Sequence, residues 1–154
     1  MFEFDMKSAF FDQKKVIDAM DVATRRSMIK SLAKVRRRLI RTYRRGKKAS
    51  APGQPPRVHS RSRYANLKNV LFAYDTTTQQ GVVGSVKLPR SKVAVPGLLE
   101  GGGIIKYNNA RRRGGAPGKP QVIHIKPRPA VGPALKQSIE SGEIVQPFAN
   151  SVRG

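Results

Sequence analysis

Cysteine and tryptophan are both absent from this chain of 154 residues, and histidine occurs only twice. Without cysteine the chain can form neither a disulfide nor a thiolate metal site, and nothing favours an oxidising compartment. No apolar run approaches the roughly 20 residues that a membrane-spanning helix requires. The first residues, MFEFDMK, lack the basic and apolar regions of a secretory signal. These absences predict a protein that is cytosolic or part of something assembled in a cytosol.

Acidic residues are also scarce, because nine Asp and Glu stand against 31 Lys and Arg, a formal net charge of +22. Residues 22–74 contain sixteen Lys or Arg and no acid, whereas five of the nine acids lie within the first 21 residues. Such a charge attracts phosphates or acidic proteins and opposes compaction of the isolated chain. Only 38% of the residues are apolar. The core is therefore expected to be thin and to be completed by ordered loops or by neighbouring subunits.

One long amphipathic helix is predicted over residues 21–46. An apolar stripe recurs at steps of three and four residues: Met28, Leu32, Val35, Leu39 and Tyr43. About half a turn away, a basic stripe recurs at the same steps: Lys30, Lys34, Arg37, Arg41 and Arg44. Asp21 is the expected N-cap and Gly46 the residue just past the C-terminus, while residues 13–20 either extend this helix or form a short one of their own. The apolar face is expected to pack in a hydrophobic core, and the basic face is expected to contact a negatively charged partner.

Shorter elements and loops make up the rest of the chain. Strands are predicted at 67–75, 82–88, 104–107 and 121–126, the first two joined as an antiparallel hairpin. Short helices are predicted at 95–103 and 134–141. A Pro-rich loop spans 47–63, and a basic Gly/Pro-rich loop spans 108–120.

This order of elements predicts an α+β fold. The long N-terminal helix and a short C-terminal helix are expected to pack on one antiparallel β-sheet. A single domain is expected over residues 13–142, preceded by an aromatic N-terminal arm at 1–12 and followed by an extended C-terminal tail at 143–154.

No catalytic or metal-binding pattern is recognisable in the sequence. A phosphate-binding loop requires Ser or Thr after Gly-Lys, but Pro120 follows Gly118 and Lys119. His59 and His124 are too far apart in the chain to supply a metal site with its usual ligand spacing. We therefore expect a protein that is not an enzyme and that holds no cofactor and no metal.

The basic residues are the main candidates for function, since Lys and Arg neutralise phosphates without reading sequence. Candidate contacts with DNA or with an acidic partner are Lys30, Lys34, Arg37, Arg41, Arg44, Arg45, Lys47, Lys48, Arg111, Arg112, Arg113 and Lys119. Candidate contacts between subunits are Phe2, Phe4, Phe10, Phe11, Pro52, Pro55, Pro56, Leu99 and Glu100. For Glu100 a role at a helix end is the alternative. A ribosomal-type RNA-binding protein, a structural ring protein near packaged DNA and an enzyme are the competing classes, the last disfavoured.

Four short motifs occur in order: APGQPPR at 51–57, LKNV at 67–70, LLEGGG at 98–103 and PRPAVGPALK at 127–136. Together with the Arg-rich helix before them, they resemble the small neck, tail-completion or minor-tail proteins of tailed bacteriophages. The resemblance covers roughly residues 20–142.

The resemblance implies a structural virion protein, similar in fold to tail-terminator proteins, that assembles as a ring of six or twelve copies at the head–tail junction. The implied partners are other copies of the chain, the portal or head-closure connector, tail-tube or tail-terminator proteins, and double-stranded DNA passing through the lumen. No membrane is involved. Whether the basic helix face meets DNA or acidic neighbours stays open, and a ribosomal-type RNA-binding protein is the alternative function.

Overall fold

The computed structural model describes residues 13–59, 66–88, 94–107, 121–149 and 151. The predicted arm at 1–12 and the basic loop at 108–120 lie outside these ranges. The described elements, in chain order, are α1 (Gln13–Thr42), β1 (Val70–Asp75), β2 (Gln80–Ser85), α2 (Val95–Gly101), β3 (Gly103–Tyr107), β4 (Gln121–Ile125), α3 (Val131–Glu140) and the 3-10 helix η2 (Gln146–Phe148). The predicted α+β class is confirmed.

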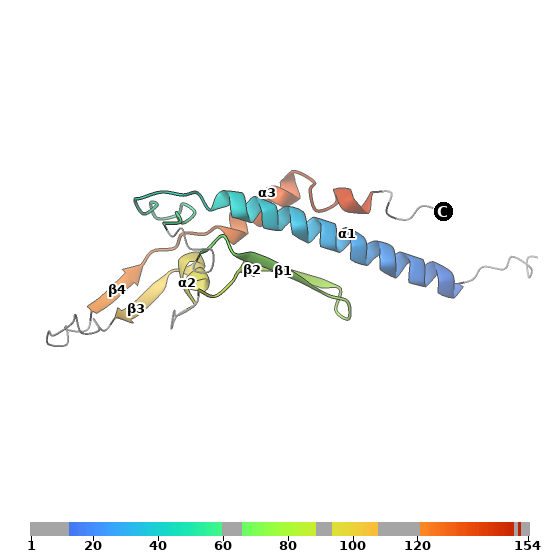
Figure 1. Ribbon diagram of the computed structural model, residues 1–154, viewed down its shortest axis with the longest axis horizontal. Coiled ribbons are helices and arrows are strands. Elements are labelled where there is room, and N and C mark those ends of the chain that lie inside the picture. Colours follow the sequence, from blue (N-terminus) through green and yellow to red (C-terminus); the bar gives the residue numbers. More distant parts are fainter. Residues whose placement is uncertain (1–12, 60–65, 89–93, 108–120, 150, 152–154) are drawn as a thin grey trace, which may run out of the picture.

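The long helix α1 runs along the long axis of the molecule (Figure 1). Its predicted apolar stripe is confirmed in the C-terminal half, where Leu32, Val35 and Leu39 are buried. The predicted N-cap is wrong, because nothing in residues 13–20 breaks a helix and Asp21 therefore lies inside α1. The predicted end is also wrong. The helix stops at Thr42, because the chain then turns to pair with the Pro-rich loop, where the Arg44 carbonyl oxygen accepts a bond from the Val58 N–H.

The strands form two separate antiparallel hairpins, so the prediction of one sheet is wrong. β1 pairs with β2 from Val70↔Ser85 to Asp75↔Gln80, which confirms the predicted first hairpin. β3 pairs with β4. Gly102 and Gly103 have positive φ (73° and 152°) and turn the chain from α2 directly into β3. In Figure 1, α2 separates the two hairpins, so β3 does not reach the first one.

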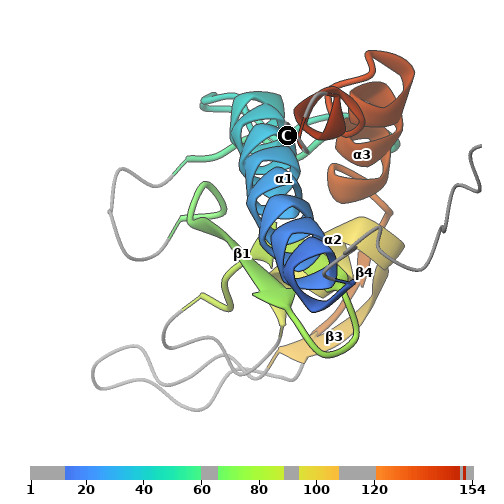
Figure 2. The same ribbon diagram turned by 90° about the vertical axis from the view of Figure 1, so that its right-hand side faces the viewer.

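The helix α1 lies between two layers. The hairpin β1–β2 packs on one side of α1, and α3 with η2 packs on the other (Figures 1 and 2). The core lies at the C-terminal half of α1, where the layers meet the Pro-rich loop. Its buried members are Leu39, Tyr43, Val58, Leu67, Val70, Ala130 and Ala134.

The segment after α3 is folded against α1, so the predicted extended tail is wrong for residues 143–149. Two buried serines on α1 explain the difference, because their small side chains allow a close approach and their hydroxyls satisfy backbone carbonyls. The Ser27 hydroxyl donates to the Pro147 carbonyl oxygen (2.9 Å), and the Ser31 hydroxyl donates to that of Ile144 (2.7 Å).

A candidate polyanion-binding groove

A groove of about 820 Å³ lies where the basic face of α1 meets the Pro-rich loop and the C-terminal segment. Six cationic side chains line it: Lys34, Arg37, Arg38, Arg41, Arg44 and Arg57. Glu143 is the single carboxylate among the described lining residues, which leaves a charge of +5. The groove therefore presents a concentrated positive field to solvent.

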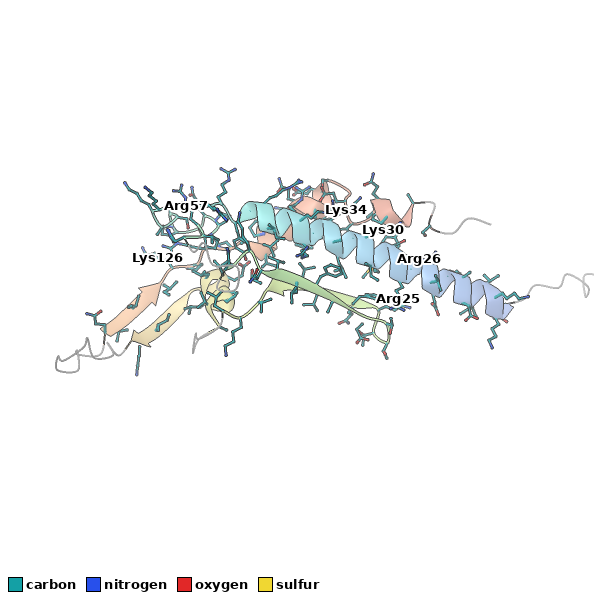
Figure 3. The ribbon with its side chains drawn as sticks, in the orientation of Figure 1. Arg25, Arg26, Lys30, Lys34, Arg57 and Lys126 are labelled. Carbon is teal, nitrogen blue, oxygen red and sulfur yellow. The ribbon has the colours of Figure 1, made fainter. Side chains whose placement is uncertain are left out.

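The helical repeat produces most of this charge. Lys34, Arg37 and Arg41 follow one another at steps of three and four residues, so they project from one side of α1. Figure 3 shows Arg26, Lys30 and Lys34 in sequence along the helix, with Arg57 beyond its C-terminal end. Arg26 and Lys30 border a second, adjacent hollow beside η2. We call this row the basic track; its members are Arg26, Lys30, Lys34, Arg37, Arg41, Arg44 and Arg57.

Backbone hydrogen bonds bring Arg57 beside the helix. The Val58 N–H donates to the Arg44 carbonyl oxygen (2.9 Å), and the Gly46 N–H donates to that of Val58 (3.4 Å). The Arg57 side chain then passes over Gly46, where a Cβ would lie 2.7 Å from the Arg57 Cδ. The absence of a side chain at Gly46 thus makes room for a groove cation.

Hydrogen bonds to residues 127 and 128 also hold the described part of the Pro-rich loop in place. The Gly53 N–H donates to the Pro127 carbonyl oxygen (2.9 Å), and the Arg128 Nε donates to that of Ser50 (3.1 Å). Ser50 lines the groove, but its hydroxyl is buried and has no hydrogen-bond partner among the described residues. The loop thus adds Arg57 to the cations in the wall of the groove.

Arg38 and Glu143 form the ion pair of the groove. The Arg38 Nε donates to Glu143 Oε2 (3.0 Å), and its Nη2 lies 2.6 Å from Oε1. The Arg38 Nη2 also donates to the Ser141 hydroxyl (3.1 Å). This hydrogen bond from Arg38 holds the pKa of the Glu143 carboxyl below its ordinary value and raises the pKa of Arg38. Arg38 thus fixes residues 141–143 to α1.

The other groove cations have no such partner within the described chain. Lys34 Nζ donates to the Gln146 side chain, a neutral acceptor, and Arg37 Nε donates to the Ala33 carbonyl oxygen (3.4 Å). In the residues that the structure describes, no carboxylate forms an ion pair with the remaining five: Lys34, Arg37, Arg41, Arg44 and Arg57. Their charge remains available to an external anion.

The structure brings four of the predicted contact residues into the groove: Lys34, Arg37, Arg41 and Arg44. Lys30 lies next to it, and three more are exposed outside its lining: Arg45, Lys47 and Lys48. Four lie outside the described residues: Arg111, Arg112, Arg113 and Lys119. Arg38 and Arg57 also line the groove, although neither was among the predicted contacts. A signal for Arg57 was its place just before Val58, an isolated apolar residue in a polar loop.

Three of the predicted subunit contacts have contacts within their own chain: Pro56, Leu99 and Glu100. Pro56 is buried, and Leu99 packs against the core. The Glu100 carboxylate accepts N–H bonds from three residues at the start of α3: Ala130 (2.9 Å), Val131 (2.7 Å) and Gly132 (3.1 Å). Glu100 is therefore the helix-end carboxylate of the alternative interpretation. Pro52 is exposed and Pro55 lines the groove. The four phenylalanines lie outside the described ranges: Phe2, Phe4, Phe10 and Phe11.

Within the described ranges, no group of three His, Asp or Glu side chains is placed to hold a metal ion. None of the helices there is long and apolar enough to cross a membrane. No family model, no curated protein and no solved structure matches the chain. The groove and the sequence motifs are thus the features that bear on function.

Proposed function

We propose that this chain is a structural virion protein of a tailed phage. In this proposal it forms a homo-oligomeric ring at the head–tail junction, between the connector and the tail, and the groove and basic track hold phosphates of the DNA in the lumen. The observation that carries the DNA contact is the set of five groove cations without a carboxylate partner in the described chain. The ordered motifs at 51–57, 67–70, 98–103 and 127–136 support the virion context.

The chemistry of the groove favours a phosphate backbone over bases. The described residues of its lining include no aromatic ring, and single-stranded nucleic acids are usually held by stacking of bases on aromatic side chains. Arginine guanidinium groups instead match phosphate oxygens in a bidentate geometry. Contacts of this kind position DNA without reading its sequence, as a passage for a whole genome requires.

The dimensions also suit an extended anion. The helical part of the basic track, from Arg26 to Arg41, spans about 22 Å at 1.5 Å per residue. A duplex carries one phosphate charge per roughly 1.7 Å of its axis, so several phosphates lie within that span. Each neutralised phosphate releases condensed counterions, which makes the affinity depend steeply on salt.

A salt titration of binding to double-stranded DNA tests the proposal. If the five groove cations each meet a phosphate, the slope of log K against log salt is about −4.5. The variant Arg41→Gln/Arg44→Gln should reduce the magnitude of that slope by about 2. The matched control Lys87→Gln/Lys106→Gln removes two exposed cations outside the groove lining and should change it little. Equal effects of the two variants would mean that net charge alone binds DNA.

Two further measurements separate the proposal from the alternative. Tighter binding to single-stranded RNA than to duplex DNA at the same salt would favour the ribosomal-type function. Electron microscopy of purified particles should locate the chain between head and tail. Its presence on ribosomes would overturn the virion assignment.

A further inference from the structure

The first turns of α1 carry an apolar face that the described chain leaves uncovered. Figure 1 shows this end of α1 running past the hairpin β1–β2. Every residue from 13 to 22 is exposed. The side chains of Ile17 and Met20 are 50% and 52% exposed, and Val16 is 38% exposed. A helix end of this kind gains stability only when another surface covers its apolar side.

This face continues the stripe that forms the core. Ile17, Met20 and Thr24 precede Met28 and Leu32 at the same steps of three and four residues. The hairpin packs as far along the stripe as Leu32, because a Cβ on Gly81 would lie 2.6 Å from the Leu32 Cδ2. The stripe therefore extends beyond the partner that the described part of its own chain provides.

The outer face of the hairpin β1–β2 is the second uncovered apolar surface. Val70 and Phe72 alternate with Leu71 and Ala73, and the second pair points away from α1. In the register of the hairpin, Leu71 lies opposite Gly84 and Ala73 opposite Val82. Leu71 is 62% exposed and Val82 is 69% exposed. Leu71, Ala73, Val82 and Gly84 carry no charge, and Asp75 lies on the same face at the turn end of the hairpin.

The two surfaces are compatible in charge and similar in length. Residues 13–22 carry two lysines and two aspartates, so this end of α1 is neutral, and no described residue pairs with Asp18 or Asp21. Two copies that approached through their basic faces would repel each other, whereas these faces meet without repulsion. The ten-residue helix end is about 15 Å long, and a six-residue strand is about 20 Å long.

We propose that the apolar face of residues 13–22 in one copy packs on the outer face of the β1–β2 hairpin of a second copy. The two surfaces differ, so the contact is head-to-tail and repeats until a ring closes. The inference rests on the proposed function, since it supplies the subunit contact of the ring. The basic track lies outside both surfaces and stays available to DNA.

The two faces cannot meet within one copy. Gly81, the neighbour of Val82, packs on Leu32. Fifteen helical residues separate Leu32 from Ile17, a distance of about 22 Å along α1. A disulfide requires Cα atoms within about 7 Å, so a bond between positions 17 and 82 reports a contact between copies.

Disulfide trapping tests the contact cleanly, because the natural chain contains no cysteine. Purified full-length Ile17→Cys and Val82→Cys are oxidised separately and as an equimolar mixture, with and without duplex DNA. We expect a covalent dimer in the mixture and little in either variant alone. The double variant Ile17→Cys/Val82→Cys should give a ladder that ends at the copy number of the ring.

Ala19→Cys is the matched control, since position 19 is exposed and lies about 200° around the helix from position 17. Mixed with Val82→Cys, it should give no dimer. Strong dimers of Ile17→Cys alone would show a symmetric helix–helix contact and overturn the proposal. The absence of any dimer between positions 17 and 82 would also overturn it.

The DNA salt titration on the same variants separates this inference from the proposed function. Positions 17 and 82 lie outside the basic track, so the slope should match that of the natural chain. Normal DNA binding without cross-linking would overturn the proposed contact between copies and support the proposed DNA contact. Cross-linking without DNA binding would support the contact between copies and overturn the DNA contact.

Discussion

At the residue scale, Glu100 connects two distant parts of the chain. Its carboxylate accepts three backbone N–H groups at the N-terminus of α3, where Ala130 offers no side-chain cap of its own. These donors would otherwise lack intrahelical partners. A negative charge at this helix end is also favourable to the helix dipole. Glu100 thus fixes the position of α3 relative to α2.

Replacement of Glu100 by Gln should therefore destabilise the fold. Glutamine has one acceptor oxygen, and its NH2 group is a donor that would face the backbone N–H donors at the start of α3. We therefore expect a loss of about 2 kcal/mol in the free energy of unfolding. Chemical denaturation measures this loss. Glu140→Gln is the control, because Glu140 is exposed and lies 4.0 Å from Lys136, and its loss should stay below about 0.5 kcal/mol. Similar losses in both variants would contradict the capping role of Glu100.

Glu143 links stability to pH. The hydrogen bond from Arg38 lowers its pKa below the ordinary value of 4.5 in the folded chain. The stabilisation is therefore complete above pH 4.5 and is lost as the pH falls through the lowered pKa. In Glu143→Gln, the free energy of unfolding should no longer show this loss at low pH, which denaturation at a series of pH values measures. The substitution should also release Arg38 into the groove and steepen the DNA salt slope by about 1.

Asp75→Asn is the matched control for that variant. Bonds from the Thr77 N–H and the Thr78 hydroxyl lower the pKa of Asp75, so it also contributes to the acid limb. It changes the net charge by the same amount but lies outside the groove lining. Its salt slope should stay as in the natural chain. An equal slope change in both variants would point to net charge and not to Arg38.

At the element scale, the periodicity of the sequence predicted the faces of a single helix. It did not predict contacts between segments that are distant in the chain. The stripes of α1 could be read from the sequence because a helix repeats its faces over many turns. That is why Lys34, Arg37 and Arg41 were identified. Arg57 joins them through backbone bonds between Arg44 and Val58, which side-chain chemistry does not encode.

The predictions for other elements were wrong for specific physical reasons. Asp21 has the chemistry of an N-cap, but the preceding residues continue the helix and leave it inside. The C-terminal segment appeared extended because its partners, Ser27 and Ser31, are small polar residues on a helix that lies over 110 residues earlier in the chain. The first hairpin could be predicted, but the second was predicted only as two strands of the same sheet, and the separation of the hairpins depends on the turn at Gly102.

The C-terminal segment offers a test at this scale. Ser31→Ala removes the donor to the Ile144 carbonyl oxygen, so we expect about 1 kcal/mol of destabilisation. Hydrogen exchange should accelerate at the amides of Gln146 and Phe148 and stay unchanged in β1. Thr42→Ala is the control, because it removes a bond to Arg38 within α1. Unchanged exchange in the C-terminal segment of Ser31→Ala would contradict its docking through this serine.

At the scale of the whole molecule, the groove brings together cations of α1 and of the Pro-rich loop that repel one another. The C-terminal segment also lines it, and among the described residues its ion pair is Arg38 with Glu143. An anion bound between the groove cations offsets this repulsion and stabilises the folded state by mass action. Duplex DNA at 100 times its dissociation constant should add about 2.7 kcal/mol, and Arg41→Gln/Arg44→Gln should reduce the effect. Thermal unfolding with and without DNA measures it.

The continuity of α1 has a consequence for the size of the assembly. Ile17, in the proposed neighbour contact, and Arg41, in the groove, lie on one uninterrupted helix about 36 Å apart. In the proposed ring, the length of α1 thus sets the distance between the subunit contact and the groove. Seven residues inserted after Asp21 would lengthen it by about 10 Å and keep the faces nearly aligned. One inserted residue would rotate the neighbour contact by about 100° and open the ring.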